Sequence, residues 1–186
     1  MVVDDRVAAR LRAADGPTLR VFVAGCAERW AQAFCLIRAQ DPGRSDDVAL
    51  VVEALEALWR PGTAAQDFGD RRRRIMAFPE LQPSEVGLSR PEELYPFYAA
   101  LVLRYALTCA ASGDGEAAVS CAHASLTASD QLDRNVTGAG FRQSEAERQA
   151  ATLAQVEAGG PVEQLRDADR STARALARTI GDRIRR

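Results

Sequence analysis

Apolar residues recur at helical spacing through nearly the whole 186-residue chain, and no segment shows the sustained apolar–polar alternation of a half-buried strand. Short breaks that contain Gly, Pro and Asp separate these stretches. Alanine supplies much of the apolar content and aromatic residues only 6%, which favours closely packed helices. A chain of this length fits one domain with a sizeable core. We therefore predict an all-α, single-domain bundle of about seven or eight helices over residues 1–186.

Breaks and capping signals place the predicted helices at about residues 4–14, 17–40, 45–60, 64–78, 91–112, 116–132, 144–158 and 162–185. Ser144 and Glu147 have the spacing of a capping box, which sets the predicted start of the seventh helix. Residues 79–90 and 135–141 are predicted loops. The helices of residues 17–40 and 91–112 carry the most apolar side chains, so we expect them at the centre of the bundle.

The charge balance limits the classes of partner. The net charge of −2 does not favour general nucleic-acid binding, which needs a strongly basic face. The start of the chain is charged throughout and has no apolar signal segment. The longest apolar run, residues 94–111, contains Arg104 and is interpreted as a buried helix rather than a membrane span. We expect a cytoplasmic location, no membrane partner and no nucleic-acid partner.

The segment CAERWAQAFC, from Cys26 to Cys35, places two charges within a helix that is apolar on two sides. On a helical wheel Glu28 lies within one apolar stripe, and Arg29 borders the other. Neighbouring residues do not face each other on a helix, so the two charges should have separate partners. A buried Glu28 carboxylate needs a cation or a hydrogen-bond donor.

Arg104 is the only charge between Leu94 and Gly113, and we predict that it shares a buried polar network with Glu28. Nearby tyrosines could add hydroxyl groups to this network; they are Tyr95, Tyr98 and Tyr105. Such a network either fixes helix register or forms the floor of a binding site. The register role is the simpler interpretation, because structural ion pairs are common in helical cores.

No residue pattern predicts a catalytic residue, a metal site or a cofactor. Common nucleotide, hydrolase and zinc-protease motifs do not occur, which argues against an enzyme. The four cysteines form no CxxC pair and are expected to be reduced and buried. His123, the single histidine, is expected to be partly buried and hydrogen-bonded. A nucleophilic pair with Cys26 or Cys109 is the alternative.

Arginine supplies all 24 basic residues, and two groups of arginines are notable. The run Arg71–Arg74 spreads around its helix and does not form one patch. The last helix carries a row at four-residue spacing: Arg166, Arg170, Arg174 and Arg178. Like charges at this spacing destabilise a helix, so we expect carboxylates to face them. Glu163, Asp167 and Asp169 can neutralise some; the rest should meet acids elsewhere or an acidic partner.

Four segments occur in a set order: FVAGCAERWAQAF, LEALW, ELYPFYAAL and AVSCAHASL. Over about residues 19–155 this pattern resembles the YjaG-like bacterial proteins, domain of unknown function 416 (DUF416). The matching positions are Cys26, Glu28, Arg29, Leu55, Trp59, Tyr95 and Pro96. The chain departs from the family pattern at residues 31–34 and at Ala99, where the family often has an acid. The resemblance implies a cytoplasmic, all-helical bacterial protein and carries no activity with it.

Together these observations favour a non-enzymatic protein that acts through a protein partner or through self-association, in an accessory or immunity-like role. The alternative is a small-molecule or enzymatic pocket built around Glu28, Arg29 and Arg104, with Tyr95 and Tyr98 as walls. Nucleic-acid binding through the arginine rows is the weakest interpretation.

Overall fold

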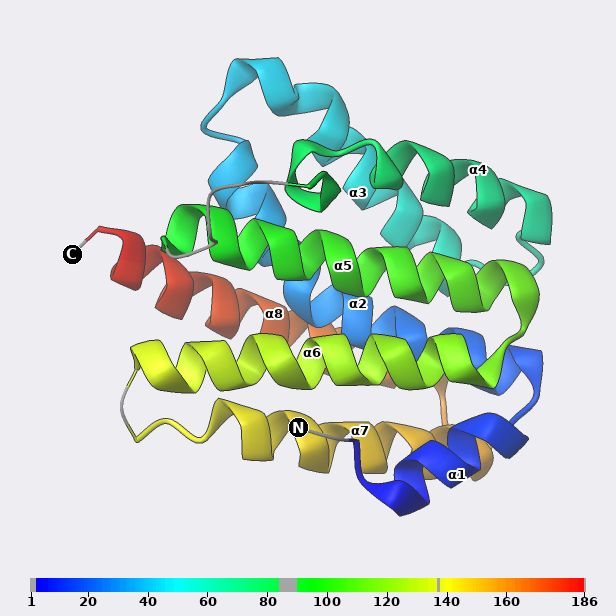
Figure 1. Ribbon diagram of the computed structural model, residues 1–186. Helices are drawn as coiled ribbons and strands as arrows, with labels where there is room; N and C mark the ends of the chain where they lie inside the picture. Colours follow the sequence, from blue (N-terminus) through cyan, green and yellow to red (C-terminus); the bar gives the residue numbers. More distant parts are fainter. Residues whose placement is uncertain (1–2, 84–89, 137, 186) are drawn as a thin grey trace.

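The computed structural model describes residues 3–83, 90–136 and 138–185, and all regular structure in these ranges is helical (Figure 1). The α-helices are α1 (Asp5–Ala13), α2 (Gly16–Arg38), α3 (Ser45–Trp59), α4 (Ala65–Met76), α5 (Pro91–Ser112), α6 (Gly115–Asn135), α7 (Phe141–Glu157) and α8 (Val162–Ile184). Short 3-10 turns occupy Pro42–Arg44 and Pro79–Leu81. The predicted all-α bundle is confirmed. Part of the predicted loops, residues 84–89 and 137, lies outside the described residues.

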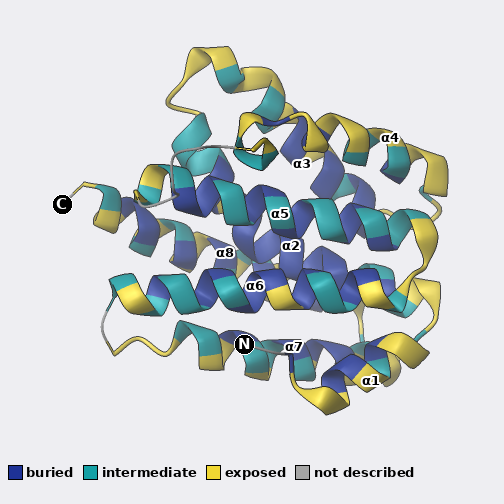
Figure 2. Cartoon of the chain, viewed as in Figure 1, coloured by how far each residue is buried: buried dark blue, intermediate teal, exposed yellow. Residues whose placement is uncertain are grey.

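Helix α2 is the central helix of the bundle. It packs against α3, α5, α6, α7 and α8, and Figure 1 shows it behind α5 and α6. Its buried residues lie on all sides, so the polar pair Glu28–Arg29 is buried with the apolar stripes. Figure 2 shows the middle of the helix as buried and its C-terminal end as intermediate. A central position explains why the sequence of α2 is apolar on two sides.

Helix α5 lies against α2, α4 and α6. Pro91 occupies its first turn, where the missing N–H costs nothing, and Gly113 ends it with a φ of 68°. By length and hydropathy alone α5 could cross a membrane, but more than half of its apolar window is buried within the bundle. This packing is typical of a core helix.

Aspartates start several helices by accepting hydrogen bonds from free backbone N–H groups. Asp4, Asp15 and Asp114 cap α1, α2 and α6 from the preceding position. Helix α7 differs, because the Asp133 carboxylate of α6 accepts from the N–H groups of Phe141 and Arg142 at 2.7 and 2.9 Å. The predicted start at Ser144 is therefore wrong by three residues. A cap supplied by another helix replaces the local capping box.

Candidate functional site

Glu28 and Arg29 are both buried, with 3% and 1% of their surface exposed, and they face different groups of helices. Arg29 contacts α7 and α8 through carboxylates. Glu28 contacts α3 and the arginine row of α8. The expectation that adjacent charges would have separate partners is confirmed. The helical wheel predicts that Arg29 borders an apolar stripe, whereas the structure encloses its side chain in the interior.

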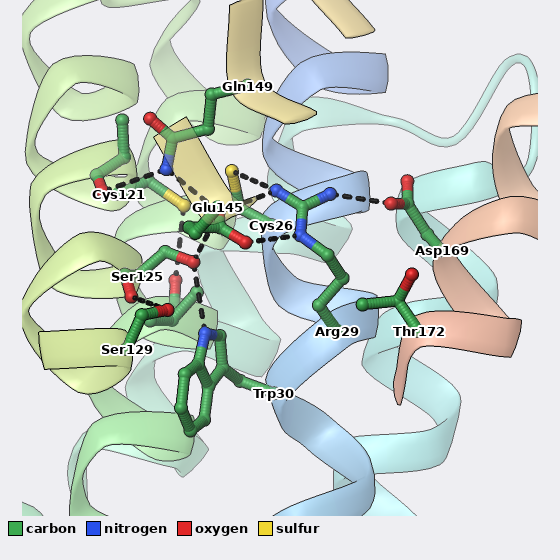
Figure 3. Close-up of polar contacts among 12 residues, drawn as sticks. Cys26, Arg29, Trp30, Cys121, Ser125, Ser129, Glu145, Gln149, Asp169 and Thr172 are labelled. Atoms are coloured by element: carbon green, nitrogen blue, oxygen red, sulfur yellow. Dashed lines mark hydrogen bonds and ion pairs between the residues drawn. The ribbon is translucent and has the colours of Figure 1, made fainter. Parts of the chain in front are cut away.

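Arg29 forms a buried ion network with two carboxylates. Its Nε and Nη2 atoms donate to the two oxygens of Glu145 at 2.8 and 2.7 Å, a two-pronged pairing (Figure 3). Its Nη1 donates to Oδ1 of Asp169 at 2.6 Å. These bonds tie α2 to α7 and α8. All three side chains are at most 4% exposed, so solvent screens the pairs little.

Neutral side chains satisfy the remaining acceptor capacity of Glu145. Its Oε1 also accepts from Ser125 and Gln149, each at 2.8 Å. The Ser125 hydroxyl in turn accepts from the indole N–H of Trp30 at 3.0 Å, and Gln149 donates to the Ala122 carbonyl (Figure 3). The network therefore extends from α2 into α6. A buried carboxylate requires hydrogen-bond donors of this kind to replace the water that it loses.

The pKa values in this network follow from the pairing. Burial by itself would lower the pKa of Arg29, but the charge of Glu145 helps to raise it well above its ordinary value. Burial would raise the pKa of Glu145, but the charge and hydrogen bonds of Arg29 lower it instead. Both groups are thus charged in the folded protein. Because Arg29 is 1% exposed and its bonds join α2 to α7 and α8, we call this network the clamp between these helices.

The clamp requires a close approach between α2 and α8 at Gly25. A Cβ atom at this position would lie 2.5 Å from Oδ2 of Asp169 and 3.2 Å from Nη1 of Arg29. Only glycine leaves room for the carboxylate. Oδ2 is buried and has no hydrogen-bond partner among the described residues. The two acids and one arginine of the network leave one negative charge in excess.

Glu28 has a different environment, near the surface. Its Oε2 accepts from the indole N–H of Trp59 at 2.8 Å, and its Oε1 lies 3.4 Å from Nε of Arg170. Arg170 also donates to Glu56 at 2.9 Å, and Arg166 binds the same Glu56 oxygen. Carboxylates and guanidinium groups therefore alternate across α2, α3 and α8.

A hollow of about 310 Å³ opens beside Glu28 on the α2–α3–α8 face. Its walls are Glu28, Gln32, Val52, Leu55, Glu56, Arg170 and Arg174. Arg166 and Arg170, the first half of the predicted arginine row, meet the carboxylates of Glu56 and Glu28 there. The expectation that Glu163, Asp167 and Asp169 neutralise the row is wrong for the described residues, and Asp169 faces Arg29 instead. Arg174 and Arg178 are exposed and have no ion-pair partner in the described parts of the chain. This hollow and the adjacent row are the candidate functional site.

The predicted network between Glu28 and Arg104 is wrong. Arg104 stacks on Tyr105, with 4.4 Å from its guanidinium carbon to the ring centre, and lines a different hollow between α4, α5 and α6. Tyr95 is buried and accepts from Asn135 at 3.1 Å, and Tyr98 packs edge-on against Phe97. A helical wheel gives the direction of a side chain but not the helix opposite it. The partners of Glu28 are Trp59 on α3 and Arg170 on α8.

The cysteines and the histidine do not form a reaction centre in the described residues. All four cysteines are free; Cys26, Cys109 and Cys121 are buried and Cys35 is half-buried. Burial raises the pKa of the Cys121 thiol well above its ordinary value. His123 is exposed, so its predicted partly buried position is wrong, and it cannot pair with a buried thiol. No cluster of three potential metal ligands occurs in the described residues.

Sequence reasoning missed Glu145 and gave Asp169 a partner in the arginine row, although a signal for the burial of both acids was present. Asp169 lies on the apolar stripe of α8, with Leu165, Ala173, Leu176 and Ile180. Glu145 likewise lies on the buried face of α7, together with Gln149, Thr152 and Leu153. An acid on a buried stripe needs a cation, and a glycine in the middle of a helix, such as Gly25, indicates a close approach.

Comparison with known proteins identifies the fold. The chain matches no protein-family model, and the comparison with curated proteins found no match. A crystal structure of a DUF416 family protein from Shewanella baltica OS155 is similar, with a TM-score of 0.65. The similarity covers 91% of this chain and 93% of that chain, at 15% sequence identity. The chain therefore has a DUF416-like fold, and the resemblance expected from its motifs is supported at the level of the fold.

Proposed function

We propose that this protein is a non-enzymatic binding protein whose α2–α3–α8 face accepts a carboxylate of an acidic protein partner. The observation that carries this proposal is the contrast along the arginine row. Arg166 and Arg170 are neutralised by Glu56, whereas Arg174 lines the hollow without a carboxylate of its own in the described residues. A carboxylate that enters the hollow would complete the alternation of charges.

The shape and polarity of this face favour an acidic side chain. The hollow is small, about 310 Å³, and Val52 at its edge is 48% exposed. The aliphatic stem of a glutamate could pack on Val52 while its carboxylate meets Arg174. Large exposed apolar residues are few in the described chain and comprise Val52, Met76 and Val162. A charged, transient interface therefore fits this protein better than a broad apolar one.

A small-molecule site is the second candidate, because Glu28 lines the same hollow. It would be built around Glu28, Arg170 and Arg174, since Arg29 is enclosed in the clamp and Arg104 lies elsewhere. Its ionisable walls are two carboxylates and two guanidinium groups, which suit recognition of a small carboxylate better than nucleophilic chemistry.

Affinity capture from the cell that makes the protein tests the first candidate. We expect a partner on the wild type that is lost from an Arg174→Glu/Arg178→Glu variant. An Arg6→Glu/Arg74→Glu variant is the matched control, because these arginines are also exposed and have no ion-pair partner among the described residues. The captured protein, once purified, should bind less tightly as salt rises. Loss from both variants would contradict a specific role of this face.

Two further measurements separate the alternatives. Light scattering of the purified protein reports a second copy as the partner, in which case Arg174→Glu/Arg178→Glu should give monomers. Calorimetry with glutarate tests the small-molecule candidate. Saturable glutarate binding that Arg174→Glu removes, together with no captured protein, would replace the first proposal by the second.

A further inference from the structure

Two features of the sequence that the proposed function does not use meet in one hollow. Arg104 is the single charge of the apolar part of α5, and Arg72 belongs to the run of four arginines on α4. Both line a hollow of about 340 Å³ between α4, α5 and α6. Its other walls are Met76, Tyr105, Thr108, Asp114, Glu116, Ala117 and Ser120.

The two arginines have no carboxylate partner among the described residues, whereas the acids of this hollow are engaged. Arg104 is held over the ring of Tyr105, a contact that leaves its N–H groups free to donate. Asp114 accepts from the Glu116 N–H as the cap of α6, and Glu116 pairs with Arg12. With Arg12 included, the charged groups at the hollow are three guanidinium groups and the carboxylates of Asp114 and Glu116, a formal excess of one positive charge.

Hydrogen-bonding groups reach the hollow from three helices. Arg72 lines it from α4, Arg104 from α5 and Ser120 from α6, and the Ser120 hydroxyl makes no hydrogen bond to any of the described residues. A planar carboxylate is satisfied by a single guanidinium fork. A tetrahedral oxyanion offers acceptors in several directions at once, which matches donors from three helices. We propose that this hollow is a binding site for inorganic phosphate.

The rest of the arginine run explains why Arg72 is the residue concerned. Arg71 donates to the Asp67 carbonyl, and Arg73 pairs with Asp70. Arg74 is exposed and does not line the hollow. Only one arginine of the run is thus placed for a ligand at this site. The phosphate site shares no helix with the α2–α3–α8 face and does not depend on the proposed function.

Calorimetric titration of the purified protein with inorganic phosphate tests the site. We expect saturable binding at one site, and at least tenfold weaker binding in Arg72→Gln and in Arg104→Gln. Arg74→Gln removes the same charge from the same helix and should bind as the wild type does. Circular dichroism of each variant confirms folding, and Arg72→Gln, at a half-exposed position, keeps the test valid if Arg104→Gln does not fold.

Three results would overturn the proposal. The first is an absence of saturable phosphate binding to the wild type. The second is an equal loss of affinity in Arg74→Gln, which would indicate a general effect of charge. The third is acetate binding as tight as that of phosphate, which would show that the site does not select a tetrahedral anion.

Discussion

The guanidinium of Arg29 donates two parallel hydrogen bonds to the carboxylate of Glu145, which lies 116 residues further along the chain. A third bond from Arg29 reaches Asp169. One side chain of the central helix thereby holds both α7 and α8 in place. Because the pair is buried, the desolvation of the two charges offsets much of their attraction. Removal of one partner is nevertheless strongly destabilising, because it leaves an uncompensated charge in the interior.

Arg29→Met should destabilise the fold by about 3–5 kcal/mol, because it leaves two buried carboxylates without a counter-charge. Urea denaturation measures the loss. A triple variant, Arg29→Met/Glu145→Gln/Asp169→Asn, should recover part of it, since the network then holds no charge. If the free energy of unfolding of Arg29→Met lay within about 1 kcal/mol of the wild-type value, the role of Arg29 as a clamp would be contradicted.

Gly25→Ala should cost about 1–3 kcal/mol, because the new Cβ would lie 2.5 Å from Oδ2 of Asp169. Gly69→Ala is the matched control in the middle of α4, where nothing lies within 4 Å of the added atom. That change should stabilise the protein by about 0.5–1 kcal/mol through helix propensity. Thermal unfolding of the two variants should therefore shift in opposite directions, and equal shifts would argue against the close approach at Gly25.

Trp59 and Glu28 should show energetic coupling, because the indole N–H donates to a buried carboxylate at 2.8 Å. A double-mutant cycle with Trp59→Phe and Glu28→Gln measures this coupling apart from the loss of ring volume. We expect about 0.5–3 kcal/mol of interaction energy from the unfolding curves. Strictly additive effects would mean that the bond contributes nothing to stability.

Glu80 should make stability dependent on pH. Burial would raise its pKa, but hydrogen bonds from Arg44 and Arg38 hold that pKa below the ordinary value of 4.5. A lowered folded-state pKa gives stability that is complete above the unfolded value and is lost as the pH falls through the folded value. The stability difference between the wild type and Glu80→Gln should therefore be constant above about pH 5 and shrink below about pH 4.5. A difference that grows in acid would reverse the assigned sign.

The cysteines should be unreactive in the folded protein. Burial raises the pKa of Cys35 to about 11 and that of Cys109 to about 12, so both are thiols at neutral pH. Labelling with a disulfide reagent at pH 8 should be slow in the native state, while all four cysteines should react rapidly in urea. Rapid native labelling of a Cys109-only variant would show that α5 opens more readily than its packing indicates.

Much of the fold could be predicted because helical period and capping chemistry are local. The predicted stretches at about residues 4–14, 91–112 and 162–185 agree with α1, α5 and α8 within two residues at each end. The start of α7 could not be predicted, since its cap is Asp133 on α6. The burial of Glu28 followed from its place within an apolar stripe.

The partners of the buried charges could not be predicted from sequence. Periodicity shows which way a side chain points from its own helix axis, and it predicted that Glu28 and Arg29 would have separate partners. It contains no information about which helix lies opposite, because that depends on how the helices pack together. The sequence by itself determined an all-helical chain with a central helix that buries charge. Only tertiary packing decided that Arg29 meets Glu145 and Asp169, that Glu28 meets Trp59, and that Arg104 shares a hollow with Arg72.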